Sequence, residues 1–461
     1  MPTSHQRPGP KKNFRNSCPL FRANRNLLTP VRHIICACSL AGYPQVKVTE
    51  PSVASAQAKL KSSQVQGLKY FKLLLPLLEQ LHEVGCARDK AGNRKLHYDQ
   101  YCLLVLLFLF NPVMRSLRAL QQASELEKVQ RKLGVSRTSL GSLSEATDVF
   151  DPERLNGIIG HLLAQLPQTR QVGRGHVAQV LTAVDGTIVQ TLSSLTQAAY
   201  MRDKHGKSHS AWRFHTHFEI DRSLPVRMDL TTAQNAGKNE EKNHLRQHLE
   251  SDRCYVMDRW YAEFKLWNQI VAAGSSYVCR IRDNSNLEQV VEERPVTAAG
   301  QQANVVRDVV VKLGRNGKGR ERPDHLVRVI LIRATPHKRT GRAGRKGGGS
   351  AGPASDGILR IATNLLDVPA EVIADIFQHR WLIELFFRFF KHMLGCRHLL
   401  STDAVGIQIQ AYCAIIACLL IHLWTGGKPT LRTFEMFCLY LQGWASLKEV
   451  QTHLAKRKIS V

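Results

Sequence analysis

The sequence predicts an α/β fold, which combines β-strands with helices. Two apolar β-like runs, residues 180–184 and 254–257, each lead directly into an aspartate and a turn. A third segment, residues 377–391, repeats its polar side chains at helical spacing inside an apolar run. A chain of 461 residues with 43% hydrophobic and 22% charged residues is typical of a globular protein with two or three domains.

The N-terminal 175 residues divide into two parts. Residues 1–65 hold ten Lys or Arg against one acidic residue, and we expect a basic, disordered extension. This extension is either an arm along DNA phosphates or the product of a start codon placed too far upstream. Residues 66–175 are predicted to form helices. Within them, Gly134 as a turn and Ser136 as an N-cap would make a helix-turn-helix bearing Arg137, although simple helix packing explains the same pattern.

The middle of the chain is predicted to alternate strands and helices. Residues 211–220 and 225–231 are β-like, a charged helical segment follows at 239–250, and the run that ends at Asp258 comes next. Residues 277–364 are again rich in β-like runs. Two acids therefore lie on the first and the fourth strand of this series.

The segment 377–391 is predicted to be one amphipathic helix. At about 100° per residue, the apolar side chains Leu385 and Phe389 point away from a polar face. That face spans an arc of roughly 60° and carries Phe377, Arg380, Glu384 and Lys391. A solvated i,i+4 salt bridge would give the same spacing. The presence of the two upstream aspartates therefore favours a functional role for this face.

Taken together, these motifs resemble the DDE transposases of the insertion-sequence 4 type. That family has a first Asp in a D-G-T-like strand end, a second in D-R-G-Y, and a Y-x2-R-x3-E-x6-K signature. This chain reads D-G-T at Asp185, D-R-W-Y at Asp258 and F-x2-R-x3-E-x6-K around Glu384. Phe377 replaces the tyrosine and Trp260 replaces the glycine. The resemblance spans about residues 100–424.

The resemblance implies an RNase H-like mixed sheet with flanking helices. It also implies a β-rich insertion before the glutamate helix and a helical N-terminal domain that binds DNA. We therefore expect the catalytic core in two parts, 176–275 and 367–425, separated by the insertion at 276–366. Residues 426–461 are expected to form a C-terminal helical segment.

The resemblance further implies a transposase that cleaves DNA at transposon ends and transfers the strands into target DNA. Oxygen ligands suit Mg²⁺ or Mn²⁺, and two ions can stabilise both the attacking and the leaving oxygen. Asp185, Asp258 and Glu384 are the candidate catalytic and metal-binding residues, with Asp185 bridging both ions. Two alternatives stay open: a catalytically inactive DNA-binding remnant or repressor, and a metal-dependent nuclease without strand transfer.

DNA is the expected partner. The formal charge of +27 favours a polyanion, and the resemblance implies terminal inverted repeats and target DNA, bound by a homodimer. Arg380 suits a bidentate phosphate contact and Lys391 a point charge. The remaining candidate DNA-binding residues are Phe377, Arg259 and Arg137.

Other features favour a cytoplasmic, nucleoid-associated protein without a membrane segment. The eleven cysteines include no C-x2-C pair, so neither a zinc nor a disulfide framework is predicted. His215 and His217 are interpreted as an ordinary strand pair. The apolar runs at 101–110 and 411–424 are shorter than the roughly 20 residues that cross a bilayer, and we expect buried helices there.

Overall fold

The computed structural model describes most of the chain from Leu74 to Ile459. The described range excludes residues 85, 87, 91, 93, 167–174, 192–198, 203–207, 233–239, 286, 288, 315–321, 335–356, 394–398 and 402. The predicted basic extension at 1–65 therefore lies outside the described residues.

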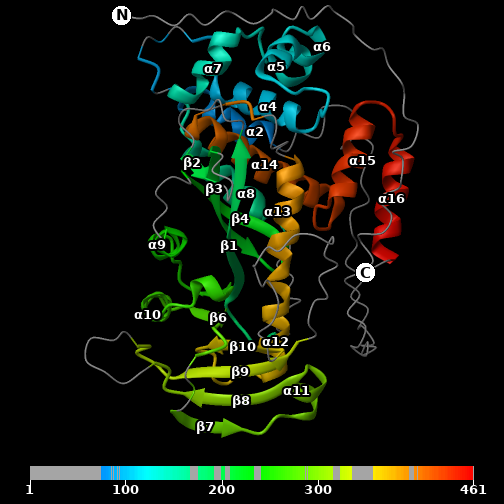
Figure 1. The fold of residues 1–461 in the computed structure, drawn as a ribbon. Helices are drawn as coiled ribbons and strands as arrows, with labels where there is room; N and C mark the ends of the chain where they lie inside the picture. Colours follow the sequence, from blue (N-terminus) through cyan, green and yellow to red (C-terminus); the bar gives the residue numbers. More distant parts are fainter. Residues whose placement is uncertain are drawn as a thin grey trace, which may run out of the picture. The chain divides into compact units, whose positions relative to one another are not determined.

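The described strands form one ten-stranded sheet (Figure 1). Its order is β2-β3-β1-β5-β6-β10-β9-β8-β7, and β4 also pairs with β3. The bounds are β1 (Val180–Thr191), β2 (Ala199–Arg202), β3 (Ser208–Glu219), β4 (Leu224–Thr232), β5 (Arg253–Met257), β6 (Ser276–Arg280), β7 (Val290–Arg294), β8 (Val305–Val311), β9 (Val327–Arg333) and β10 (Ile358–Thr363).

The sheet is parallel at its centre and antiparallel on both sides. Strands β1, β5 and β6 run parallel, whereas β3 pairs antiparallel with β1 and β4 antiparallel with β3. The parallel neighbours β5 and β6 are joined by the helix α10 (Phe264–Ala272), as parallel strands require a crossover. The predicted series of three strands, a helix and a further strand is thus confirmed, with the short strand β2 added.

The strands predicted in the β-rich part, residues 276–366, are also present, and they continue the same sheet. Strand β10 pairs antiparallel with β6 along the register Ile361 to Arg280, Ala362 to Cys279 and Thr363 to Val278. Strands β9, β8 and β7 follow by antiparallel pairing. The last strand before the glutamate helix is therefore hydrogen-bonded directly to the central parallel strands.

Helices cover both faces of the sheet, because its central strands bury alternate side chains on opposite sides. Ala183 belongs to one buried apolar cluster and its neighbour Val184 to the other. The Ala183 side is covered by α12 (Ala370–His379), α13 (Trp381–Met393) and α14 (Ala404–Thr425), and the Val184 side by α10 and α9 (Glu240–Gln247).

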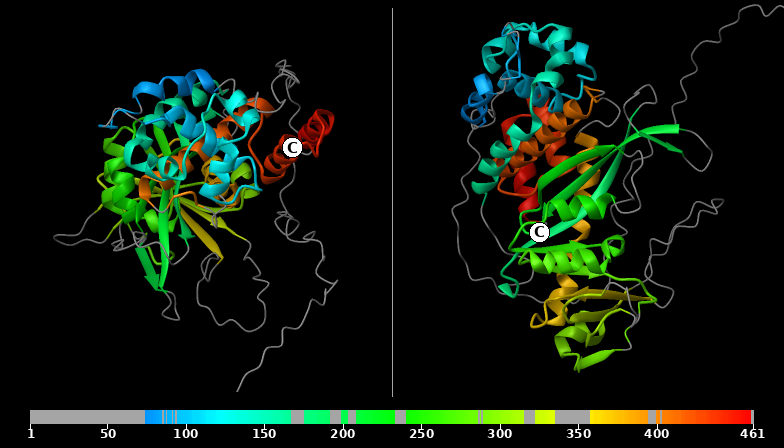
Figure 2. Two further views of the ribbon diagram at one scale, coloured as in Figure 1. Left: turned by 90° about the horizontal axis from the view of Figure 1, so that it is seen from above. Right: turned by 90° about the vertical axis from the view of Figure 1, so that its left-hand side faces the viewer.

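The predicted N-terminal helices are present. They comprise α2 (Leu75–Glu79), α3 (Leu81–Val84), α4 (Tyr98–Leu109), α5 (Leu117–Ser124), α6 (Glu127–Leu133), α7 (Leu140–Val149) and α8 (Leu155–Ala164). Figure 2 shows these helices beside α14, and α4, α7 and α8 contact it. They therefore share one apolar cluster with a face of the sheet. The remaining helices are α11 (Ala298–Gln302), α15 (Leu431–Leu441) and α16 (Leu447–Ile459).

The expected helix-turn-helix has its turn where predicted but not its second N-cap. Helix α6 ends at Gly134, whose φ of 66° is the left-handed conformation that favours glycine. Helix α7 starts at Leu140 with Ser139, not Ser136, as its N-cap, and Ser139 accepts a hydrogen bond from Ser142. The reason is that Ser124 Oγ accepts from Thr138 N at 3.1 Å, which fixes the preceding residues outside the helix.

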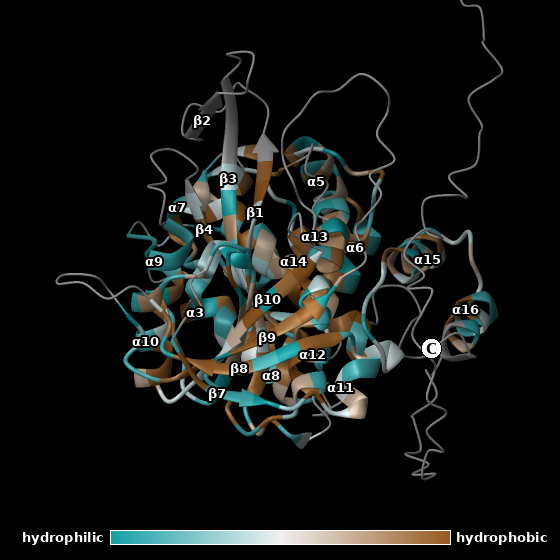
Figure 3. Cartoon of the chain, turned by 60° about the horizontal axis from the view of Figure 1, so that its bottom comes forward, coloured by the Kyte–Doolittle hydropathy of each residue, from teal (hydrophilic) through white to brown (hydrophobic). Residues whose placement is uncertain are grey.

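The apolar run predicted at 411–424 belongs to a longer helix than expected. Helix α14 has 22 residues, and by length and composition alone it would be able to cross a membrane. In the described part of the protein, 83% of its most apolar window is buried. The brown colour of α14 in Figure 3 reflects this composition, and its neighbours supply the apolar surroundings that such a helix requires.

Candidate active site

Asp185 lies within β1, not at its end. The sequence predicted a turn after this residue, but β1 continues to Thr191 because β3 pairs with it as far as that residue. Asp185 Oδ1 accepts a hydrogen bond from the amide of Gly186 at 2.8 Å. Its side chain is 24% exposed, so it is open to a ligand while most of its surface is buried.

Asp258 follows β5 directly, as predicted. Its Oδ1 accepts a hydrogen bond of 2.8 Å from Trp260 N and thereby caps the short 3₁₀ helix η4 (Arg259–Tyr261). Strands β1 and β5 are parallel, with Ala183 beside Val256. Two residues further along both strands, the same offset places Asp185 level with Asp258.

Glu384 reaches the site from α13, which packs on β1 (Figure 1). The Arg380 guanidinium joins this carboxylate to the first aspartate: its Nη2 lies 2.6 Å from Glu384 Oε1 and its Nη1 lies 3.8 Å from Asp185 Oδ2. The three predicted acids therefore meet at the centre of the sheet, two joined by this cation and two aligned on neighbouring strands.

The predicted single helix from Phe377 to Lys391 is interrupted at Arg380. Helix α12 ends before it and α13 begins after it, because the amides of Arg380 and Ile383 bond three residues back, to Phe377 and Arg380. The prediction that Phe389 lies on a buried apolar face is confirmed. The same prediction is wrong for Leu385, which is 43% exposed.

The environment of Asp185 is unfavourable for its negative charge. Burial, reinforced by the neighbouring carboxylate of Asp258, raises the pKa of Asp185 to about 7. The Arg380 guanidinium and the Gly186 amide act in the opposite direction. Such a shift indicates a site that gains stability when a cation neutralises its acids.

The two departures from the family motifs fit without a clash. The Trp260 side chain is 49% exposed, and Lys242 Nζ lies 5.4 Å from the centre of its ring. Phe377 is half-buried against the apolar cluster of the sheet. Neither replacement displaces an acid from the site.

Two arginines near the second acid pair with another carboxylate, Asp283. Arg259 Nη1 lies 4.0 Å from Asp283, and Arg360 Nη1 lies 3.9 Å from the same carboxylate. Burial together with the charge of Arg259 lowers the pKa of Arg280. Lys391 is half-buried in the last turn of α13, whereas Arg137 pairs with Glu125 at 3.3 Å in the N-terminal helices. Arg259 and Lys391 thus lie on the elements next to Asp258 and Glu384, and Arg380 lies directly before α13, whereas Arg137 lies in a different part of the fold.

Sequence reasoning missed a fourth acid, Glu241. It lies in the first turn of α9, 3.2 Å from Arg213, and its Oε1 would be 2.5 Å from a Cβ added to Gly186. Burial raises the pKa of Glu241, with Asp258 adding to the effect. The only signal was its place in a charged helical segment, which does not show that α9 folds back over β1.

The predicted strand histidines are buried and uncharged. Burial lowers the pKa of His215 to about 3, and it lowers the pKa of His217 well below its usual value. His215 Nε2 lies 2.8 Å from Thr231 Oγ1. The described cysteines, 86, 102, 254, 279, 413, 418 and 438, are all free thiols.

Residues 178–420 match the family described as Transposase DDE domain. The chain belongs to this family. The matched range begins just before β1 and ends inside α14, so it includes Asp185, Asp258 and Glu384. The presence of all three acids in one DDE domain agrees with their convergence on β1, β5 and α13.

Two relatives are described as transposases. The first, y4zB of Sinorhizobium fredii (strain NBRC 101917 / NGR234), is 26% identical over 265 residues, which are 57% of this chain and 65% of that protein. The second belongs to insertion sequence element IS5377 of Geobacillus stearothermophilus and is 26% identical over 243 residues, or 52% and 56% of the two chains. The chain thus spans less than two thirds of the length of both relatives.

A solved structure of the piggyBac transposase synaptic complex with hairpin DNA also matches. It covers 86% of each chain at 9% identity, and its TM-score is 0.35. At that score the similarity carries no argument about fold or mechanism.

Proposed function

We propose that this chain is a DNA transposase of the insertion-sequence 4 type, which cuts DNA at the ends of its element and joins those ends to target DNA. The observation that carries the proposal is the meeting of Asp185, Asp258 and Glu384 in a Transposase DDE domain, with Arg380 within 4 Å of two of them. The D-G-T and F-x2-R-x3-E-x6-K motifs support the finer assignment.

The donor set fits divalent metal ions. All three side chains offer carboxylate oxygens, the ligands that Mg²⁺ and Mn²⁺ prefer, and the burial that raises the pKa of Asp185, reinforced by Asp258, supports a site whose charge a cation would neutralise. Asp185 would lie between the two ion positions, with Asp258 and Glu384 each completing one. When bound, a pair of such ions stabilises the attacking and leaving oxygens of a phosphodiester.

The protein's own residues would position the DNA. Arg380 lies at the acids and would bind a phosphate when its ion pair with Glu384 opens. Lys391, two turns after Glu384 on α13, would contact a neighbouring phosphate. Arg259 and Phe377 would contact the same DNA from either side. Arg137 lines a cavity with Arg94 and Lys95 and with the acids Asp89 and Glu145, and this excess of one positive charge supports an additional DNA contact by the N-terminal helices.

We also propose that strands β4, β3, β1, β5 and β6 are an RNase H-like core. The antiparallel β1, β3 and β4 with β5 and β6 added in parallel support this assignment. Residues 66–175 would then recognise transposon ends, 276–366 would be the insertion, and two chains would act together as a homodimer. The burial of α14 supports a protein without a membrane span, for which we propose a cytoplasmic, nucleoid-associated location.

Cleavage and strand transfer of DNA test the proposal. The substrate is a labelled fragment that carries the terminal sequence flanking the element's gene, with a supercoiled plasmid as target. Wild type should cut and join with Mg²⁺ and not with EDTA, and Glu384→Gln should do neither. Glu371→Gln, in the first turn of α12, is the matched control and should retain activity.

The two alternatives predict different results in the same assay. A nuclease without strand transfer would cut the fragment but fail to join a precut end. An inactive remnant or repressor would bind the fragment and leave it intact. Equal cutting by wild type and Glu384→Gln would remove this glutamate from the active site.

A further inference from the structure

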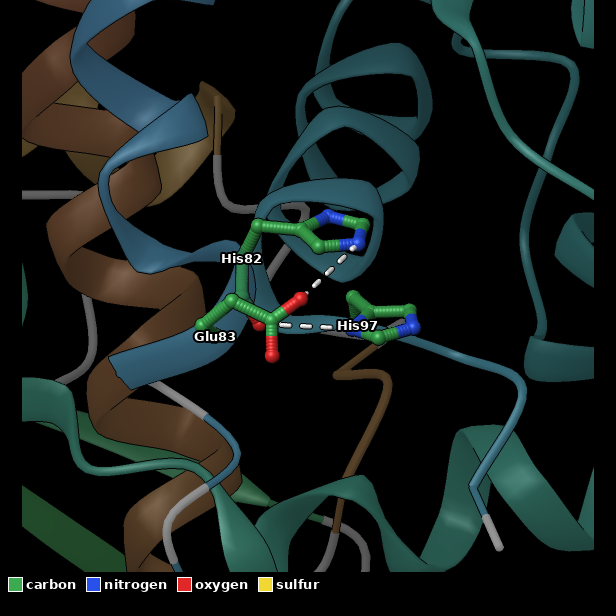
Figure 4. A group of neighbouring side chains, drawn as sticks. All are labelled: His82, Glu83 and His97. Atoms are coloured by element: carbon green, nitrogen blue, oxygen red, sulfur yellow. Dashed lines mark hydrogen bonds and ion pairs between the residues drawn. The ribbon is translucent and has the colours of Figure 1, made fainter.

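Two groups of histidine and carboxylate side chains lie away from the three acids. The first comprises His82, Glu83 and His97 (Figure 4). Its two imidazole rings are stacked, with centroids 3.7 Å apart and planes within 8° of each other. Because a metal ion binds in the plane of an imidazole, two parallel stacked rings cannot share one ion. Glu83 is also 88% exposed, so this group carries no proposal.

The second group comprises Asp229 on β4 with His244 and His248 on and just after α9. One ligand atom from each lies within 4.8 Å of the other two, and His244 Nε2 is 3.5 Å from Asp229 Oδ2. The two rings are tilted by 33°, with centroids 4.3 Å apart. Asp229 is buried and both histidines are half-buried, so the group is shielded from bulk water.

Further contacts orient each of these side chains as the ligands of a metal site are oriented. His248 Nδ1 donates to the carbonyl oxygen of His244 at 2.9 Å, which leaves Nε2 as the acceptor. Arg227 holds Asp229 through two hydrogen bonds of 2.6 and 3.2 Å. His215 stacks on His244 at 4.2 Å, which fixes that ring from the β3 side.

Helix α9 makes few apolar contacts with the rest of the protein. Leu245 is its only buried residue, and Figure 3 shows the helix as hydrophilic. Its other anchors are ion pairs from Arg213 to Glu240 and Glu241, and from Lys242 and Arg246 to Glu263. An eight-residue helix is marginal by itself, so a cross-link from α9 to the sheet would contribute much of its stability.

We propose that Asp229, His244 and His248 bind one transition-metal ion of the Zn²⁺ class, which fastens α9 to β4. Two imidazoles spaced i,i+4 with one carboxylate are a three-ligand set for tetrahedral Zn²⁺, and water completes the fourth position. Nitrogen ligands favour Zn²⁺ or Co²⁺ over Mg²⁺. The Arg227 guanidinium shares the charge of Asp229, so the imidazoles provide most of the affinity and the selectivity.

This ion would influence the candidate active site only indirectly, by fixing the position of α9. His244 lies one helical turn after Glu241, whose carboxylate rests against Gly186, the neighbour of Asp185. Fixing α9 on β4 would therefore fix Glu241 and its partner Arg213 beside the candidate active site. The proposal does not depend on transposase activity.

Cobalt binding tests the site directly in the full chain, after treatment with a chelator and its removal. We expect one equivalent of Co²⁺ to give the visible absorption of a tetrahedral nitrogen-bound ion, and Zn²⁺ to displace it. The titration is made in the Asp185→Asn/Glu384→Gln background, so that the three acids do not contribute. His248→Gln should weaken binding at least tenfold, and His82→Gln, in the group of Figure 4, should leave it unchanged.

Hydrogen exchange gives a second readout that needs no variant. Zn²⁺ should slow exchange of the α9 amides and leave those of α16 unchanged. No visible band below about 100 μM Co²⁺, an equal band in His248→Gln, or unchanged exchange in α9 would each overturn the proposal. If His248→Gln does not fold, His244→Gln, which removes the other imidazole, takes its place with the same expectations.

Discussion

The carboxylate of Glu241 lies directly against the α-carbon of Gly186, so that a Cβ at this position would be 2.5 Å from Oε1. No side chain fits between them unless the glutamate moves. Glycine at this position of the D-G-T motif thus lets α9 approach the β1 backbone beside the first acid without moving Glu241.

Gly186→Ala should push Glu241 out of its ion pair with Arg213. We expect a loss of about 1 kcal/mol in the free energy of unfolding and a slower cleavage rate. Urea unfolding and the cleavage assay measure the two effects. In the Glu241→Ala background, which already lacks the ion pair and the clash, Gly186→Ala should cost no further stability, and a further loss would mean that the alanine strains the backbone instead.

The contribution of Asp185 to the stability of the metal-free protein should fall as pH rises from about 4 to 7, whereas buried histidines such as His215, whose pKa is lowered, contribute in the opposite direction. Asp185 has a raised pKa of about 7 in the folded chain and an ordinary value near 4 when unfolded. Between these two pKa values the folded state keeps a proton that the unfolded state has lost. The stability that protonated Asp185 contributes at low pH is therefore lost as pH rises from about 4 to 7. Relative to wild type, Asp185→Asn should therefore gain stability as pH rises through this window and, in EDTA at pH 8, be more stable by about 1–3 kcal/mol. A parallel profile in the variant would contradict the pKa.

The same proton should compete with metal binding. Up to pH 7, the apparent affinity of wild type for Mn²⁺ should increase by up to about tenfold for each unit that the pH rises, because one carboxylate must lose its proton. Above pH 8 the affinity should level off. Calorimetric titration at several pH values measures this, and a flat profile from pH 5.5 to 8 would show that Asp185 is already ionised.

Arg328 and Asp308 form an ion pair that is almost wholly buried, with side chains 4% and 5% exposed and atoms 2.6 Å apart. Arg328 also donates to the carbonyl oxygens of Leu366 and Val368, just before α12. Arg328→Ala should destabilise the protein by about 3–5 kcal/mol, because it strands a buried carboxylate. Thermal unfolding measures this loss of stability. As a control, Arg307 forms an exposed ion pair with Glu293, and Arg307→Ala should lower the free energy of unfolding by less than about 1 kcal/mol.

Lys391→Ala should weaken DNA binding by a similar factor for every sequence. If the side chain contacts one phosphate, the slope of log affinity against log salt should decrease by about one. Titrations of the terminal fragment at several salt concentrations provide the slope. Lys448→Ala, on the exposed surface of α16, is the control. An unchanged slope would assign Lys391 to a solvated helix face.

Much of the site could be predicted because its chemistry depends on local patterns. Asp258 follows an apolar strand, and the spacing from Arg380 to Glu384 places their side chains together on one helical turn. The interruption of that helix at Arg380 was not predictable, because it comes from a change in backbone hydrogen bonding without a proline or glycine. The continuation of β1 beyond Asp185 depends on pairing with β3, which lies more than twenty residues away.

The contacts that sequence reasoning missed all join distant segments. Glu241 meets Gly186 only because α9 folds back over the sheet, and β10 joins β6 across nearly eighty residues. Ser139 replaces Ser136 as the N-cap because Ser124, on another helix, holds Thr138. Local periodicity predicts which segments are helices and strands, but it does not predict which distant segments they contact in the folded chain.

The pairing of β10 with β6 also has a consequence for synthesis of the chain. The ribosome completes Asp185 and Asp258 well before it reaches α13, and β10, which precedes α13 in the chain, must close a long loop to pair with β6. A nascent or prematurely terminated chain therefore carries two of the acids without the third. Such a chain could not assemble the full set, so competence to cut would arise only late in translation.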